Sequence, residues 1–144
     1  MGAVRLSAGS PDLLLRSQPR SSRDCSRALG QGEVGARLQA ERPSDVCISA
    51  ITLAELRYGA DRKGSRKLRA LTDTFTAAVE VAPFDEAAAA EFGRIGSLLA
   101  DRRTSIGEFD ALIAAHAVAL RCTLVTNNVR HFSKVPGLSV ENWA

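Results

Sequence analysis

Acidic and amide side chains stand beside apolar segments at three separate places in this 144-residue chain. Asp110 lies in a run made mostly of Ala, Leu and Ile, and a carboxylate on a buried helix surface is costly unless it is paired or bound to a metal ion. Glu55 follows the apolar residues 46–48, and Asn128 follows the apolar residues 123–126. Oxygen ligands without His or Cys suit a hard cation such as Mg²⁺ or Mn²⁺, and such ions commonly serve phosphoryl chemistry.

The two acids also have a structural interpretation as helix caps. Thr52 and Glu55 have the spacing of a capping box, and so have Ser105 and Glu108. With Ser105 as the N-cap, Asp110 would lie past the first turn, where the benefit of the helix dipole has faded. Capping therefore explains Glu55 completely but leaves Asp110 unexplained, unless it is a partly solvated structural residue.

Other polar residues have simpler explanations. Asn127 and Asn128 are also typical of a polar turn. His116 lies six residues after Asp110, on a different part of the helix surface, which favours a hydrogen-bonded core histidine over a base. His131 follows the turn. We assign neither histidine a role.

The elements that must position these residues alternate between helix and strand. Short, fully apolar strands between helices predict a parallel α/β sheet covered on both faces, in which ligand sites lie at the carboxyl ends of the strands. From residue 34 onward, the patterns predict a helix at 34–41, a strand at 46–48, a helix from 52 that Gly59 weakens or ends, a helix at 65–78, an extended edge segment at 79–84, helices at 85–103 and 105–120, and strands at 123–126 and 138–140.

Composition narrows the class of protein. No apolar run approaches the length of a membrane span or of a signal peptide, so we expect a cytoplasmic protein. Nucleotide-binding, zinc-protease and serine-hydrolase motifs are absent. The three cysteines are far apart, which predicts buried free thiols: they are Cys25, Cys47 and Cys122.

Positive charge is concentrated in one stretch. The net charge of +3 is too small to indicate nucleic-acid binding by itself. Residues 57–69 contain one acid among several basic side chains, which could either bind a nucleic-acid backbone or form a solvated helix face. The candidates for backbone contacts are Arg57, Lys63, Arg66, Lys67 and Arg69.

Three ordered motifs resemble the PIN-domain ribonucleases of the VapC toxin type. They are ISAITLAEL at 48–56, IGEFDALIAAHA at 106–117 and LVTNN at 124–128, the last followed by VPGL and ENW. The resemblance begins near residue 34. It implies a three-layer α/β/α sandwich with a parallel central sheet, an acidic Mg²⁺ or Mn²⁺ site that cuts RNA phosphodiester bonds, a cognate VapB-like antitoxin, and a homodimer. Carried over by motif, Glu55 and Asp110 match metal-binding acids, and Asn128 matches the fourth site position.

The N-terminal part of the chain departs from this family. The family opens with an apolar strand that ends in Asp-x-Asn, whose Asp is a metal ligand, and nothing here matches it. Asp12 precedes the apolar residues 13–15 instead of following a strand, and Asp24 has no apolar run before it. We therefore expect an atypical segment at 1–33, with its strand atypical or missing, and a PIN-like domain at 34–144. We expect residues 13–15 to fill the strand position.

Three hypotheses follow. The first is a VapC-like endoribonuclease in which Glu55 and Asp110 hold the metal ion and Asn128 supports a bound water or the substrate. Because the first acid of the family is missing, the second is a catalytically impaired remnant that only binds an antitoxin or a partner subunit. The third is a structural α/β protein whose acids are only caps.

Overall fold

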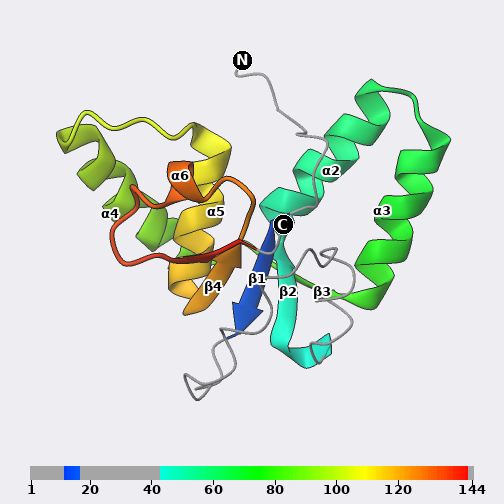
Figure 1. Ribbon diagram of the computed structural model, residues 1–144, viewed down its shortest axis with the longest axis horizontal. Coiled ribbons are helices and arrows are strands. Elements are labelled where there is room, and N and C mark those ends of the chain that lie inside the picture. The colour runs from blue at the N-terminus through cyan, green and yellow to red at the C-terminus, as the bar shows by residue number, and fades with distance from the viewer. Residues whose placement is uncertain (1–11, 17–42, 143–144) are drawn as a thin grey trace.

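A five-stranded sheet forms the centre of the fold, and helices pack against both of its faces (Figure 1). The computed structural model describes residues 12–16 and 43–142. In spatial order the strands are β3 (Glu80–Ala82), β2 (Val46–Ser49), β1 (Leu13–Arg16), β4 (Cys122–Val125) and β5 (Ser139–Glu141). The helices are α2 (Ala50–Arg62), α3 (Arg66–Ala78), α4 (Glu86–Asp101), α5 (Glu108–Ala119) and α6 (Val129–Phe132), and a 3₁₀ turn covers Pro43–Asp45.

Side chains of β2 alternate between two hydrophobic cores. Val46 and Ile48 pack with Phe75 of α3 on one face. Cys47 belongs to the larger core on the other face, which includes Ile95 of α4. The period of two along a strand thus places α3 and α4 on opposite sides of the sheet. The predicted three-layer α/β/α arrangement is confirmed.

Strand β1 runs in the opposite direction to its neighbours. It pairs antiparallel with both β2 and β4, whereas β2 with β3 and β4 with β5 are parallel pairs. The segment 13–15 fills the central position as expected, and its Leu14 is buried. The predicted parallel sheet is confirmed for β2 with β3 and for β4 with β5, and β1 is the atypical strand, because it is antiparallel to both of its neighbours. An antiparallel strand satisfies the backbone groups of β2 and β4 as well as a parallel one would, so pairing alone does not dictate the direction.

Helix α2 begins three residues earlier than the capping box predicted. Its N-cap is Ser49, whose hydroxyl accepts a hydrogen bond of 3.0 Å from the Ile51 amide. Thr52 is buried inside the helix, and the helix continues through Gly59 to Arg62, so the predicted start and end are both wrong. Because Ser49 already caps the helix, Glu55 lies in its second turn and is not a capping residue.

Helix α5 also begins without a capping box. Its N-cap is Gly107, at φ 87°, a conformation that favours glycine, and no side chain caps the helix. Asp110 lies in the first turn and not beyond it, which corrects the expected start at Ser105. Glu55 is therefore no cap, whereas Asp110 lies in the first turn, where the helix dipole favours a carboxylate, so the hypothesis of purely structural acids stays a prediction for Asp110.

Other expectations are confirmed for the described part of the chain. Ser65 and Asp85 cap α3 and α4 through hydrogen bonds of 3.2 and 3.0 Å, and β3 is an edge strand. Cys47 and Cys122 are buried. Among the described residues, no helix is long and apolar enough to cross a membrane. The helix expected at 34–41, Asp24 and Cys25 lie outside the described residues.

Replacing Leu14 tests whether β1 is part of the sheet. Leu14 is 1% exposed, so Leu14→Ala should lower the free energy of unfolding by about 2–5 kcal/mol, the usual cost for a buried leucine. Leu71→Ala on α3, where the leucine is 55% exposed, should change it by less than about 0.5 kcal/mol. Urea denaturation followed by circular dichroism measures both. Equally small effects would mean that β1 does not occupy the sheet in solution.

Candidate functional site

The polar residues expected from the sequence lie at the sheet edge where β2 and β4 end. Glu55 is on α2, which begins directly after β2. Asn128 follows β4 and is the N-cap of α6. Asp110 is in the first turn of α5, which runs antiparallel to β4 and so begins beside the end of that strand. Three segments far apart in the sequence thus bring these side chains to one edge.

Asp12 joins the same edge because β1 is reversed. Leu13 pairs with Val125, the last residue of β4, so Asp12, one residue before Leu13, lies next to Thr126, the residue that follows β4. The Thr126 hydroxyl donates a hydrogen bond to the Asp12 carboxylate. Asp12 precedes its strand, so it does not match the sequence pattern of the family, in which the acid follows the strand. In an antiparallel strand, however, the first residue is the one that lies at the carboxyl ends of the neighbouring strands.

Asp12, Glu55 and Asp110 form a cluster of carboxylates, here called the acidic cluster, that influence one another electrostatically. Burial, then the negative charges of Asp110 and Asp12, raise the pKa of Glu55 to about 7. Burial raises the pKa of Asp12 to about 6, with the charge of Asp110 adding to it and the Thr126 hydrogen bond opposing it. Burial also raises the pKa of Asp110, and nearby His131 opposes that change. Like charges are therefore held together without full compensation.

Asn128 reaches the acidic cluster through His131. The Asn128 backbone amide donates a hydrogen bond of 3.1 Å to the Thr126 hydroxyl. Its side-chain nitrogen Nδ2 lies 2.9 Å from Nδ1 of His131, and that Nδ1 lies 3.4 Å from Oδ2 of Asp110. The sequence had assigned His131 no role, because its contact with Asp110 joins two helices that no local pattern connects.

His116 is a core histidine, as expected. It is fully buried, its Nδ1 lies 2.8 Å from the Ser49 hydroxyl, and its ring packs edge-on against Phe84 at 5.3 Å. Burial lowers its pKa, with the charge of Asp85 acting in the opposite direction. A buried neutral ring of this kind stabilises the fold and supplies no catalytic base.

The acidic cluster fits an open cation site better than a closed cage. Among the described residues, no group of three or more His, Cys, Asp or Glu side chains is arranged to hold a metal ion. Mg²⁺ typically uses only one or two carboxylates, with water and substrate phosphates supplying its remaining ligands. The carboxyl pKa values are raised first by burial and, at Asp12 and Glu55, also by neighbouring negative charge, and a divalent cation would offset both effects. The donor set therefore suits a hard divalent ion.

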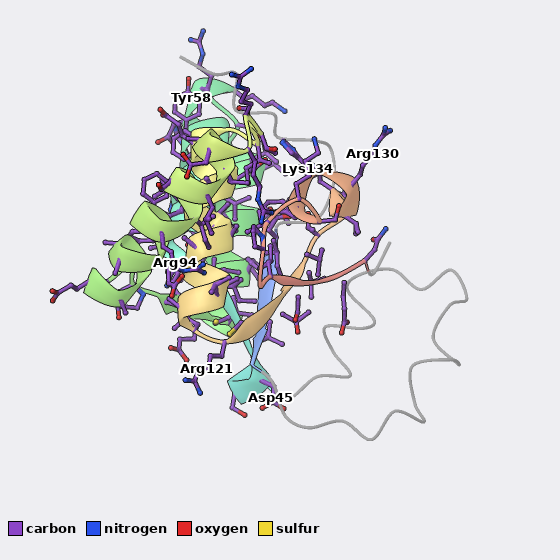
Figure 2. The ribbon with its side chains drawn as sticks, turned by 90° about the vertical axis from the view of Figure 1, so that its left-hand side faces the viewer. Asp45, Tyr58, Arg94, Arg121, Arg130 and Lys134 are labelled. Atoms are coloured by element: carbon purple, nitrogen blue, oxygen red, sulfur yellow. The ribbon has the colours of Figure 1, made fainter. Side chains whose placement is uncertain are left out.

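Basic side chains lie beyond the site on the same end of the molecule. Figure 2 shows Arg130 and Lys134 of the α6 region at the end that also carries Tyr58, opposite the end with Asp45 and Arg121. In the stretch 57–69, Arg57 and Arg69 form ion pairs with Asp73 and Asp61 at 2.5 and 2.7 Å. The exposed basic residues of this stretch that have no ion pair with a described residue are Arg62, Lys63, Arg66 and Lys67.

Comparison with known proteins identifies the family of the chain. The model of the PIN domain matches residues 27–138. The tRNA(fMet)-specific endonuclease VapC of Salmonella typhimurium is 40% identical over 101 residues, which are 69% of this chain and 76% of that protein. Ribonuclease VapC2 of Rickettsia felis is 37% identical over 99 residues, which are 68% of this chain and 74% of that protein.

Solved structures agree with this relationship. The crystal structure of DNA-bound VapBC from Salmonella typhimurium matches with a TM-score of 0.73 and 37% identity, over 77% of this chain and 84% of that one. VapBC2 from Rickettsia felis, bound to a promoter DNA fragment, matches with a TM-score of 0.65 and 37% identity, over 68% and 74%. The three motifs, the sandwich fold and these similarities agree, and the chain belongs to the PIN-domain family as a VapC-type toxin.

Proposed function

We propose that this chain is a metal-dependent endoribonuclease. The observation that carries the proposal is the acidic cluster, in which burial raises the pKa of all three carboxyl groups and the charge of Asp110 adds to the rise at Asp12 and Glu55, at the sheet edge where Asn128 also lies. Relatives named as VapC ribonucleases and as a tRNA-specific endonuclease support RNA as the substrate class. The cleaved bond would be a phosphodiester.

Glu55 and Asp110 would hold the ion, and Asp12 would supply the third carboxylate in place of the first acid of the family. No described Lys or Arg compensates these three groups, so the cation itself is the natural counter-charge. Bound Mg²⁺ or Mn²⁺ would supply activation of water and neutralisation of the phosphate oxygens. Asn128 would orient that water or the substrate through its amide.

The RNA backbone would contact the basic residues of the turn between α2 and α3. The turn between α2 and α3 lies at the same end of the molecule as the start of α5 (Figure 1). Lys63, Arg66 and Lys67, at and just after this turn, are exposed and lack ion-pair partners among the described residues. Phosphate contacts of this type are independent of sequence and position the substrate.

The remaining partners follow from the relatives. The similar structures are VapBC complexes, which supports a VapB-like antitoxin as the inhibitor of this chain. We further propose a homodimer that acts on RNA in the cytoplasm. The rival proposal is a remnant that binds the antitoxin without cleaving RNA. It is weakened by the presence of Asp12 in the acidic cluster, and the first experiment below decides between the two.

Neutralising single acids tests the site. Asp110→Asn and Asp12→Asn should each lower the rate of Mn²⁺-dependent tRNA cleavage by more than about 100-fold, since loss of groups that merely support metal ligands already costs about 10- to 100-fold. Asp101→Asn, at the exposed end of α4, is the matched control and should cleave normally.

Two results would contradict these assignments. Full activity of Asp12→Asn would remove Asp12 from the site. No cleavage by a folded wild-type protein, together with Mn²⁺ binding that does not depend on Asp110, would favour the remnant.

The raised pKa values predict that an active-site acid destabilises the metal-free fold. The pKa of Glu55 is about 7 in the folded protein, against an ordinary value of 4.5. Below pH 4.5 the carboxyl group is protonated in both the folded and the unfolded state and does not lower the free energy of unfolding. This stability is lost as the pH rises through 7, because ionisation is less favourable in the folded protein. Glu55→Gln should therefore raise the melting temperature at pH 8 and leave it nearly unchanged at pH 4. His116 acts in the opposite direction but is present in both proteins, so their difference isolates Glu55.

Calorimetry without metal and with Mn²⁺ at pH 8 measures this effect. Mn²⁺ should raise the melting temperature of the wild type more than that of Glu55→Gln, because the ion binds the folded state through this carboxylate. A lower melting temperature for Glu55→Gln at pH 8 without metal would contradict the proposed repulsion.

Removing positive charge should affect RNA binding and not the chemical step. A triple variant with Lys63, Arg66 and Lys67 changed to Gln should raise KM with little change in kcat. It should also reduce the slope of log affinity against log salt by about 0.7 per removed charge. Arg94→Gln on α4, whose arginine is ion-paired with Glu91, serves as the control. An unchanged salt slope would show that RNA binds elsewhere.

A further inference from the structure

His131 contacts two residues of the proposed site, Asn128 and Asp110, and has no role in it so far. It lies on α6, three residues after Asn128, and its backbone amide donates a hydrogen bond of 3.0 Å to the Asn128 carbonyl. The next residue, Phe132, is buried in the larger core and anchors this short helix. The backbone therefore fixes the position of His131 relative to Asn128.

One ring nitrogen faces both of these neighbours. Nδ1 lies 2.9 Å from Nδ2 of Asn128 and 3.4 Å from Oδ2 of Asp110. An amide nitrogen only donates hydrogen bonds, so in this contact Nδ1 accepts and the ring proton is on Nε2. Nδ1 then has no hydrogen for Asp110, and 3.4 Å is longer than the 2.7–2.9 Å that is usual for a charge-assisted hydrogen bond. The contact with Asn128 is the better one, and it leaves the Asp110 carboxylate available.

This contact decides which way the Asn128 amide points. With Nδ2 donating to His131, the amide oxygen Oδ1 is left without a hydrogen-bond donor among the described residues. On the backbone side, Asn128 is held by the Thr126 hydroxyl, which also donates to Asp12. Asn128 is thus fixed at both its backbone and its side chain, with one oxygen free.

We propose that His131 is a positioning residue that orients the Asn128 amide, so that Oδ1 is available to a water molecule or cation at the acidic cluster while Asp110 remains free to bind the ion. This inference rests on the proposed function for its purpose. The orientation itself does not depend on activity and can be measured without RNA or metal.

The matched variants are His131→Ala, His131→Gln and, as a control on the same short helix, Arg130→Ala. Alanine removes the acceptor, whereas the Gln side-chain oxygen can accept from Asn128 Nδ2 in its place. Arg130 projects away from the α6 ribbon (Figure 2) and has no described ion pair, so its loss should change nothing in the site.

Long-range ¹H–¹⁵N NMR of the metal-free wild type at pH 8 gives the tautomer of His131 and the side-chain amide signals of Asn128. We expect the Nε2–H tautomer. We also expect Asn128 amide signals that move in His131→Ala, stay close to wild type in His131→Gln and do not move in Arg130→Ala. The Nδ1–H tautomer, or unchanged Asn128 signals in His131→Ala, would overturn the proposal.

Two functional measurements separate positioning from a merely structural role. His131→Ala should lower kcat and weaken Mn²⁺ binding by about tenfold each, with KM for RNA unchanged, and His131→Gln should recover most of both. Equal losses in the Ala and Gln variants, in step with their melting temperatures, would overturn the proposal. Absence of RNA cleavage by the wild type, with the expected NMR result, would refute the proposed function and leave the orientation of Asn128 by His131 established.

Discussion

The burial of three carboxyl groups near one another at one edge of a sheet is the constraint on which the rest of the structure depends. Burial and mutual charge raise the pKa of Asp12 to about 6 and that of Glu55 to about 7, and burial raises that of Asp110. Such an arrangement opposes folding at neutral pH, so rigid elements must hold it in place. The buried helix α5 and the core strands β2 and β4 provide that rigidity, at a cost in stability that a bound cation would offset.

The reversed strand β1 explains how a chain without the usual first motif can still present three acids. In this chain the acid comes before its strand, and the strand runs antiparallel to β2 and β4. Because the first residue of an antiparallel strand lies beside the carboxyl ends of its neighbours, Asp12 lies at the same edge as the residues that follow β2 and β4. Because Thr126 bonds both Asp12 and the backbone of Asn128, the reversed strand is also connected to the opposite side of the proposed site.

Two of the acids and the layered fold were predictable from local sequence patterns. Glu55 and Asp110 stand out because acids are rare in apolar contexts, and alternating helices and strands indicate a sandwich. The starts of α2 and α5 were not predictable, because a cap depends on the backbone of one residue, here Ser49 or Gly107, and several nearby residues can form a capping box. The direction of β1 was not predictable either, since a four-residue apolar strand pairs both ways. Contacts of His131 depend on tertiary structure alone.

Anomalous diffraction from crystals of the wild-type protein soaked in Mn²⁺ tests the central claim most directly. We predict one manganese peak at the edge of the sheet, with carboxylate oxygens of Asp12, Glu55 and Asp110 as its protein neighbours and with β1 antiparallel to β4. A peak coordinated by Glu55 and Asp110 alone, with Asp12 turned away or β1 absent from the sheet, would contradict the claim that the reversed strand completes the site.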